Sequence, residues 1–221
     1  MKVKTILFVL SVLCLTIACA KDRSVDEPKK ETYEGHFECR GVTYETLQAA
    51  VDACAAAGEF SEITLVGNVK DDGAVIPDGI GDCFMLDLSA FKYVLNEGKC
   101  LNVGDNDAVL QASGGRIEGN GVIIKSAGEE LSFCDNIIIK GDISASSEVC
   151  FEEDFLGIFE GSLSLDESNA YFSSELADMH IVNLTTKGSD AGIQVFNAPK
   201  GGIRIDNVIS DAKCPGCAMK E

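Results

Sequence analysis

Basic residues are scarce in this sequence. It contains 18 Lys and Arg against 36 Asp and Glu in 221 residues, a formal net charge of −18. Residues 1–20, which resemble a removable leader, carry two of the basic residues and none of the acidic ones, so the remaining chain has a charge of 16 − 36 = −20. Nucleic acids and polyanionic glycans repel such a chain. We therefore expect no nucleic-acid partner, and no polyanionic glycan without a bridging cation.

Aromatic residues, histidine and familiar catalytic motifs are also scarce. There is no Trp, and there are two His and four Tyr, so the exposed aromatics that glycan-binding faces often use are few. The sequence has no G-x-S-x-G nucleophile motif and no glycine-rich phosphate loop followed by a helix. His180 is the one histidine in the strand-rich region, where a single His is more often a surface or packed residue than a base. We therefore assign no catalytic residue, no cofactor and no resident metal.

The N-terminal segment, 1–20, has the pattern of an export leader. Lys2 and Lys4 give a positive start, residues 6–17 form an apolar run too short for a transmembrane span, and small residues follow. Two processing routes fit. Residues 15–19 (LTIAC) resemble a relaxed bacterial lipobox in which Cys19 is lipidated, whereas residues 18–20 (ACA) fit an ordinary signal peptidase. We favour the lipoprotein, held at the bacterial outer membrane or cell surface through its lipid alone; the alternative is a secreted protein.

Residues 21–36 are polar and contain Pro, as expected of a flexible tether, and the folded domain is predicted over 37–221. Eight cysteines follow Cys19, an even number that permits a disulfide framework, although their connectivity cannot be read from the sequence. Cys214 and Cys217 have the spacing of a redox or half-zinc motif, but no second pair or nearby His accompanies them. A disulfide or terminal clamp, or free thiols, is the favoured interpretation of this pair; redox chemistry and metal binding are the alternatives.

One stretch, residues 41–79, predicts a helix followed by a strand. Apolar residues recur at Leu47, Ala50, Val51 and Cys54 with helical spacing, and Gly58 lies where a helix stop is expected. Cys54 is therefore expected to be buried. The following run, residues 62–66 (EITLV), is short and β-rich and is closed by Gly and Asn. One helix followed only by strands indicates a helix that covers the end of a long sheet stack.

Similar short runs recur along the rest of the chain at steps of roughly 22 residues, a period typical of a solenoid whose turns each contain three short strands. Alternating apolar and polar residues inside the runs point one side chain inward and the next outward. We expect these runs to begin at Ile63, Met85, Val109, Ile137, Ile158, Ile181 and Ile203.

The opening of this pattern resembles the pectin-lyase-like superfamily. The resemblance is carried by Y-x-T-L-Q-A-A-V-D-A-C, E-I-T-L-V-G-N-V, V-I-P-D-G and M-L-D-L-S, and it covers about residues 37–210. It implies an all-β fold, a single-stranded right-handed parallel β-helix with an N-terminal capping α-helix. It implies little about activity, because this superfamily includes lyases, hydrolases and adhesins. An uncovered last coil would be an open sheet edge, which a partner or a disulfide-closed loop could shield.

Catalytic signatures of that superfamily are missing here. There is no G-H-G element, Asp71-Asp72 lies in the first turn, and basic residues that could serve as a lyase base are few. Asp105 and Asp107, on a glycine-led turn, are a candidate calcium or ligand site, although the spacing of a dedicated calcium loop is missing. We expect a non-catalytic binding, adhesion or structural role, with polysaccharide or another surface protein as partner. The alternative is a carbohydrate-active enzyme, a polysaccharide lyase or glycoside hydrolase.

Overall fold

Mostly parallel strands make up the larger part of the structure, which is a computed structural model. It describes residues 31–57, 62–79, 83–189 and 191–211. The strands lie in the second of two units, Tyr33–Glu221; the first unit is Met1–Thr32. The described elements are β1 (His36–Cys39), β2 (Val42–Tyr44), α2 (Leu47–Ala57), β3 (Ile63–Val66), β4 (Val69–Val75), β5 (Phe84–Asp87), β6 (Lys92–Gly104), β7 (Ala108–Ser126), β8 (Glu130–Ala145), β9 (Glu148–Phe151), β10 (Ile158–Asp166), β11 (Asn169–Phe172), β12 (Asp178–Lys187), β13 (Gly192–Val195) and β14 (Ile203–Ser210).

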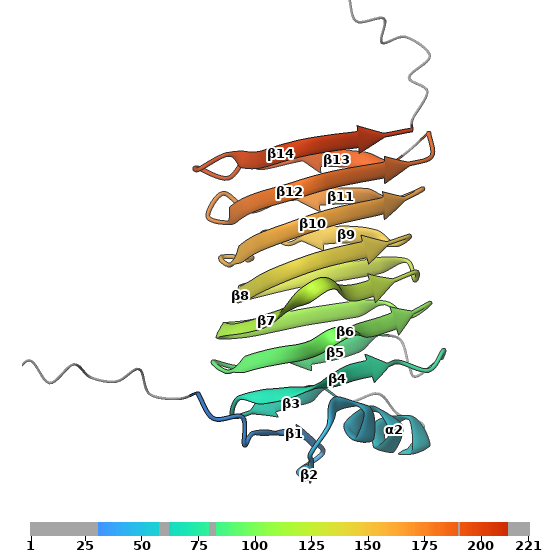
Figure 1. The fold of residues 1–221 in the computed structure, drawn as a ribbon, viewed down its shortest axis with the longest axis vertical. Helices are drawn as coiled ribbons and strands as arrows, with labels where there is room; N and C mark the ends of the chain where they lie inside the picture. The colour runs from blue at the N-terminus through green and yellow to red at the C-terminus, as the bar shows by residue number, and fades with distance from the viewer. Residues whose placement is uncertain (1–30, 58–61, 80–82, 190, 212–221) are drawn as a thin grey trace, which may run out of the picture. The chain divides into compact units, whose positions relative to one another are not determined.

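The strands wind into a β-solenoid of about six turns. One face is formed by β3, β5, β7, β8, β9, β11 and β13, and the neighbouring faces by β4, β6, β7, β8, β10, β12 and β14. In Figure 1 the chain climbs from β3 to β14; the strands at the front point to the right and the chain returns behind them, so the coil is right-handed. The predicted right-handed parallel β-helix with one helix near its N-terminus is confirmed.

The predicted strand starts do not all lie on one face, however. In the observed register Ile63 lies beside Leu86, and the column continues through five further inward positions. Its steps are unequal, because the turns between strands differ in length: the shortest runs from Phe133 to Phe151 and the longest from Leu86 to Leu110. The predicted starts follow this face as far as Val109 and then move to the adjacent face at Ile137. The remaining members of the column are Leu110, Phe133, Phe151, Phe172 and Val195.

Inward side chains form a continuous apolar column. Phe151 stacks on Phe133 with ring centroids 5.2 Å apart and on Phe172 at 4.9 Å, the latter with planes only 6° apart. All three rings are buried. The parallel register places one ring above the next in neighbouring coils, so the inward side chains of each coil pack on those of the coil before it. Burial of such rings is the main stabilising contribution, at about 25 cal/mol per Å² of apolar surface.

The N-terminal end is covered by α2 together with the hairpin β1–β2, in which β1 also pairs antiparallel with β3. The predicted cap consisted of the helix alone. Thr46 caps the helix, since its Oγ1 accepts a hydrogen bond from the N–H of Ala49. Gln48 closes part of the strand edge: its side-chain amide exchanges two hydrogen bonds with the backbone of Val75 on β4, as a neighbouring strand would.

A disulfide ties this cap together. Cys54, on the buried face of α2, is bonded to Cys39 at the end of β1. Cys54 is buried as expected, and the structure adds the partner that the sequence could not identify. His36, assigned to the tether, is the first residue of β1 and pairs with Val66.

The C-terminal end is different. β14 pairs with β12 on one side, and no described strand lies on its other side. Seven of its eight residues are exposed. Of the described helices, none is long and apolar enough to cross a membrane. The leader with Cys19, residues 21–30 of the tether, and the pair Cys214 and Cys217 lie outside the described residues.

Candidate functional site

One outer face of the solenoid is acidic. It is built by β5, the first parts of β7 and β8, and β9, which lie side by side in parallel register. Because side chains alternate along each strand, outward positions of successive coils form columns; Glu130, for example, lies directly beside Glu148. We use the name acidic face for the carboxylates that line the two depressions of this surface: Asp107, Glu129, Glu130, Glu148, Glu152, Glu153 and Asp154.

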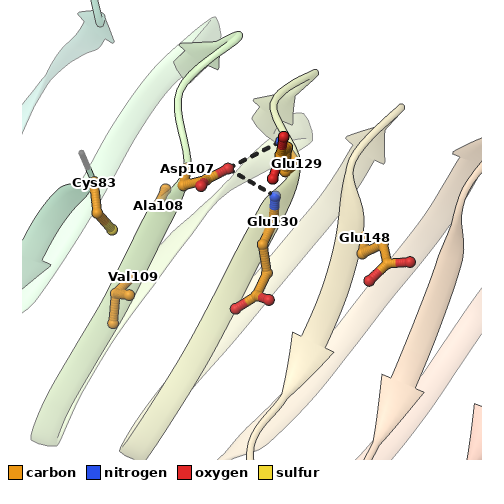
Figure 2. Close-up of a pocket in the computed structure, with 7 residues that line it drawn as sticks. All are labelled: Cys83, Asp107, Ala108, Val109, Glu129, Glu130 and Glu148. Atoms are coloured by element: carbon orange, nitrogen blue, oxygen red, sulfur yellow. Dashed lines mark hydrogen bonds between the residues drawn. The ribbon is translucent and has the colours of Figure 1, made fainter. Parts of the chain in front are cut away.

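The larger depression is an open groove of about 590 Å³. Figure 2 shows its side chains rising from consecutive coils, with Cys83 at one end and Glu148 at the other. Asp107 supports the groove from within: one of its oxygens accepts hydrogen bonds of 2.9 Å from the backbone N–H groups of Glu129 and Glu130. Asp107 therefore fixes the turn that presents these two glutamates.

Ser132 connects this groove to the second depression. Its hydroxyl is within hydrogen-bond reach of Glu130 and lies 3.0 Å from Oε1 of Glu152. A hydroxyl has one proton, so it donates to one carboxylate at a time. The other carboxylate then faces an oxygen lone pair, and an incoming cation or N–H donor would relieve that repulsion.

Cys150 lies beside the same two carboxylates. Three atoms of types that can bind a metal, one from each of Glu130, Cys150 and Glu152, lie within 4.8 Å of one another. The two carboxylates offer the oxygen ligands that calcium takes at about 2.3–2.6 Å and are close enough to contact one cation, whereas the protonated thiol of Cys150 is not a calcium ligand. Exposed acidic groups take up this spacing without a metal as well, so the geometry permits a cation and does not identify one.

Two thiols on this face are held in the protonated form. Burial, followed by the nearby carboxylates, raises the pKa of Cys134 and of Cys150 to about 12. The pKa of Cys83 is raised as well, again by burial first and then by Asp107 and Glu130. Because the thiolate is the nucleophile, these cysteines are poorly suited to nucleophilic or redox chemistry near neutral pH.

A stacked aromatic pair, half-buried Tyr171 and exposed Phe196, lies next to the acidic face. Tyr171 points outward from β11, donates a hydrogen bond of 3.0 Å from its hydroxyl to Glu148, and stacks on Phe196 with ring centroids 5.9 Å apart. Phe196 is 66% exposed. The neighbouring Phe172 faces the core, so the sequential pair Tyr171-Phe172 divides between the two sides of the strand.

Basic side chains are missing from the segments that build this face. No Lys, Arg or His occurs in residues 105–115, 127–136 or 146–157. On the other faces, basic residues pair with carboxylates: Lys92 with Glu118, and Lys140 with Glu160, at 2.7 and 2.9 Å. The acidic composition of the whole chain therefore explains only part of the negative charge on the acidic face. The rest is a local excess of carboxylates over basic residues.

The structure separates the two residues of the predicted calcium turn. Asp107 lines the groove, whereas Asp105 is exposed on the preceding turn and does not line it. The residue between them, Asn106, is buried and donates to the carbonyl of Val103. Calcium binding at this turn stays a prediction.

Other residues considered from the sequence have structural roles. Asp71 is buried in the first coil, where it bonds the start of α2, Gly73 and Tyr93. His180 points outward on β12 and pairs with Asp206. The acidic run Glu152 to Asp154, by contrast, belongs to the acidic face.

Sequence reasoning missed that this run joins acidic residues from two earlier coils. Asp107, just before β7, and Glu130, at the start of β8, belong to these earlier coils, whereas Glu148 begins β9, which the run follows, so no local motif contains all of them. The observed strand register of β7, β8 and β9 brings them together. Aligning the coils on their inward Leu110, Phe133 and Phe151 would have revealed the column.

The sequence matches no protein-family model, and searches of the curated proteins and of the solved structures give no match.

Proposed function

We propose that this protein is an exported surface protein whose acidic face binds, without catalysis, a segment rich in Arg and Lys on another protein. The observation that carries the proposal is the concentration of seven carboxylates on one flank of the solenoid, in segments that contain no basic residue. A surface of one sign attracts and orients a partner of the opposite sign.

The chemistry of the face suits guanidinium and ammonium groups. Glu130 and Glu152 compete for the single proton of Ser132, and an N–H donor from a partner would satisfy the carboxylate that is left over. Arg pairs with carboxylates through two parallel hydrogen bonds and also stacks on aromatic rings. The stacked pair of half-buried Tyr171 and exposed Phe196 offers such a ring beside Glu148.

The export part of the proposal rests on the leader. We propose that Cys19 is lipidated and anchors the protein, with the solenoid held away from the membrane by the polar tether. Mass spectrometry of the mature N-terminus tests this, because an acylated Cys19 is incompatible with cleavage after Ala20. We also propose membership of the pectin-lyase-like superfamily, supported by the quoted opening motifs and the capped parallel solenoid.

A binding assay with matched variants tests the main proposal. The test variant replaces Glu130, Glu148 and Glu153 by Gln. The control variant makes the same change in net charge elsewhere, at the exposed residues Glu97, Asp166 and Glu175 (Gln, Asn, Gln). The probes are an oligo-arginine peptide, an oligo-glutamate peptide, and neutral and cationic oligosaccharides.

We expect the oligo-arginine peptide to bind the wild-type chain and the control variant alike, and the test variant about tenfold more weakly, with affinity falling as salt rises. Equal loss in both variants would show that net charge alone acts and would overturn a role for this face. Binding of a neutral oligosaccharide in preference to the peptide would overturn the choice of partner.

Glycoside hydrolysis is the second candidate function. It is favoured by the same carboxylates, since hydrolases of this fold use clustered acidic residues as acid and base. The general acid of such a hydrolase normally lies in an apolar pocket, and Glu130 is exposed. Release of reducing sugar from a panel of polysaccharides, abolished by Glu130→Gln or Glu152→Gln, would establish hydrolysis in place of simple binding. A lyase is disfavoured because this face lacks a basic residue to remove the proton.

A further inference from the structure

The last described coil leaves apolar side chains uncovered. Inward positions of β12 are shielded by β14: Leu184, which lies beside Val208, is only 6% exposed. Val208 itself is 63% exposed, and Ile205 and Val195 at other inward positions of this coil are exposed as well. These three residues would belong to the core if another strand layer followed. The backbone edge of β14 is open on the same side among the described residues.

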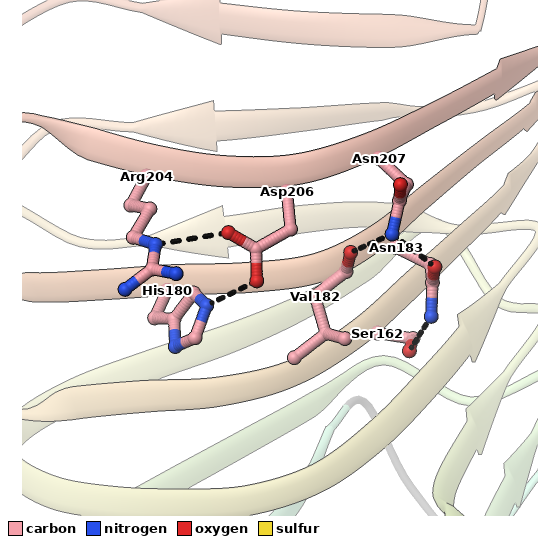
Figure 3. Close-up of polar contacts among 7 residues, drawn as sticks. All are labelled: Ser162, His180, Val182, Asn183, Arg204, Asp206 and Asn207. Carbon is pink, nitrogen blue, oxygen red and sulfur yellow. Dashed lines mark hydrogen bonds and ion pairs between the residues drawn. The ribbon is translucent and has the colours of Figure 1, made fainter.

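Side-chain contacts hold this edge in a fixed conformation. Figure 3 shows Asp206 accepting hydrogen bonds of 2.9 Å from His180 on the coil below and from Arg204 on its own strand. Asn207 continues a ladder downward, donating to Asn183 at 3.2 Å. At the end of the strand, Thr186 donates to Ser210 at 2.8 Å. β14 is thus anchored along its length and presents a preformed template for pairing.

We propose that a second copy of this chain covers this end, with β14 of the two copies paired antiparallel about a two-fold axis between Asp206 and Asn207. The inward and outward positions of β14 support this choice. Its inward residues are those that lie beside the buried residues of β12, namely 203, 205, 208 and 210. These four positions are spaced symmetrically about the point between Asp206 and Asn207. Two-fold pairing therefore places Ile205 opposite Val208 of the other copy, and core side chains face core side chains on both.

Charge favours the same occupant. The last described coil, residues 192–211, contains Lys200, Arg204, Asp206 and Asp211, so its net charge is 2 − 2 = 0 in a chain of −18. Two copies of the acidic face would repel each other, whereas two copies of this end have no net charge to oppose contact. The end is also the part of the solenoid where an edge strand needs protection from indiscriminate pairing.

A two-fold dimer is a closed assembly that uses the same end of both copies. Head-to-tail stacking would need the N-terminal end of the solenoid as well, and that end is blocked. The opposite end of the solenoid carries α2 and the β1–β2 hairpin, and Gln48 already occupies part of the backbone edge of β4. A second copy cannot add its last coil there without displacing them. An isologous dimer through β14 is therefore the assembly that the two ends permit. This inference concerns the end of the solenoid and does not depend on the function proposed for the acidic face.

Hydrogen exchange of the amides of 203–211, measured at high and at low protein concentration, tests the dimer together with sedimentation equilibrium. We expect a concentration-dependent dimer, in which these amides are protected at high concentration and lose protection on dilution. Val208→Asp should give a monomer with fast exchange at both concentrations. Val75→Asp is the matched control, because Val75 is 59% exposed on a strand at the other end; it should dimerise as wild type does.

A chain that lacks residues 212–221 distinguishes the dimer from the alternative in which the chain's own C-terminal segment covers β14. Protection that is independent of concentration and lost in this truncated chain would show that the chain's own C-terminal segment covers β14, and would overturn the dimer. A monomer with unprotected 203–211 at every concentration would overturn it as well. Dimerisation that survives Val208→Asp would place the interface elsewhere.

Discussion

The carboxylate of Asp71 accepts a hydrogen bond of 2.9 Å from the backbone N–H of Leu47, the first residue of α2, which lies 24 positions earlier. Its other oxygen accepts from the hydroxyl of Tyr93 and from the N–H of Gly73, at 2.6 and 2.8 Å. One buried side chain in β4 thus joins the cap to the first two coils. A negative charge at a helix N-terminus is also favourable because of the helix dipole.

Replacing Asp71 by Ala should destabilise the protein strongly. Three donors would lose their acceptor, among them the hydroxyl of the fully buried Tyr93. Leaving buried donors unpaired costs about 1–3 kcal/mol for each group, so we expect a loss of about 3 kcal/mol or more in the free energy of unfolding. Urea unfolding followed by circular dichroism measures it. Asp72→Ala, at the exposed neighbouring position, should have little effect; equal losses in both variants would contradict this role for Asp71.

Tyr93 should link stability to alkaline pH. Burial raises its pKa well above the usual 10, and the nearby Asp71 raises it further. A group whose pKa is raised by folding gives stability that is complete below its unfolded pKa and is lost as pH rises toward the folded pKa. Ultraviolet absorbance of tyrosinate should therefore show the last of the four tyrosines ionising together with unfolding. In Tyr93→Phe that step should vanish and alkaline unfolding should need a higher pH; an unchanged alkaline transition would argue against the link.

The alternating pattern and the helix-then-strand order were enough to predict the solenoid, because inward residues such as Leu86 and Leu110 repeat coil by coil. The pattern could not give the register after Val109, since the coils differ in length and two faces of one coil have similar apolar runs. The pairing of Cys39 with Cys54 depends on the hairpin β1–β2, which folds back on β3 and has no repeat to reveal it. The acidic face was missed for the same reason as the register, because its members come from different coils.

The thiols of Cys134 and Cys150 should react slowly with iodoacetamide. With a pKa of about 12 they are almost wholly protonated at pH 8, whereas a cysteine of pKa about 8.5 is substantially ionised. Peptide mass spectrometry should show modification at least about a hundredfold slower in the folded protein than in urea. Replacing Glu130, Glu152 and Asp154 by their amides should raise the rate only in part, because burial is the larger cause. Equal rates in folded and unfolded protein would contradict the shielding.

Acid should loosen the last coil through Asp206. His180, followed by Arg204, lowers the pKa of this carboxyl. A carboxyl with a lowered pKa gives stability that is present above its unfolded pKa of about 3.9 and is lost as pH falls through its folded pKa. Carbon NMR of the Asp206 carboxyl should show the lowered pKa, and His180→Asn should raise it. His36→Asn, which changes the other histidine, should leave the Asp206 titration where it was; a shift in both variants would rule out the specific contact.

The close approach of neighbouring coils at Gly161 should make this position intolerant of any side chain. A Cβ there would collide with the backbone carbonyl of Gly141 in the coil below, and backbone in a parallel ladder cannot move aside without breaking the hydrogen bonds of β10. We expect Gly161→Ala to lower the free energy of unfolding by about 1–3 kcal/mol, as overpacking does in protein cores. Gly201→Ala is the control, since a Cβ at Gly201 meets nothing within 4 Å, and it should be neutral or slightly stabilising. Urea unfolding of the two variants decides the matter, because equal stability would mean that the coils are not packed this closely at Gly161.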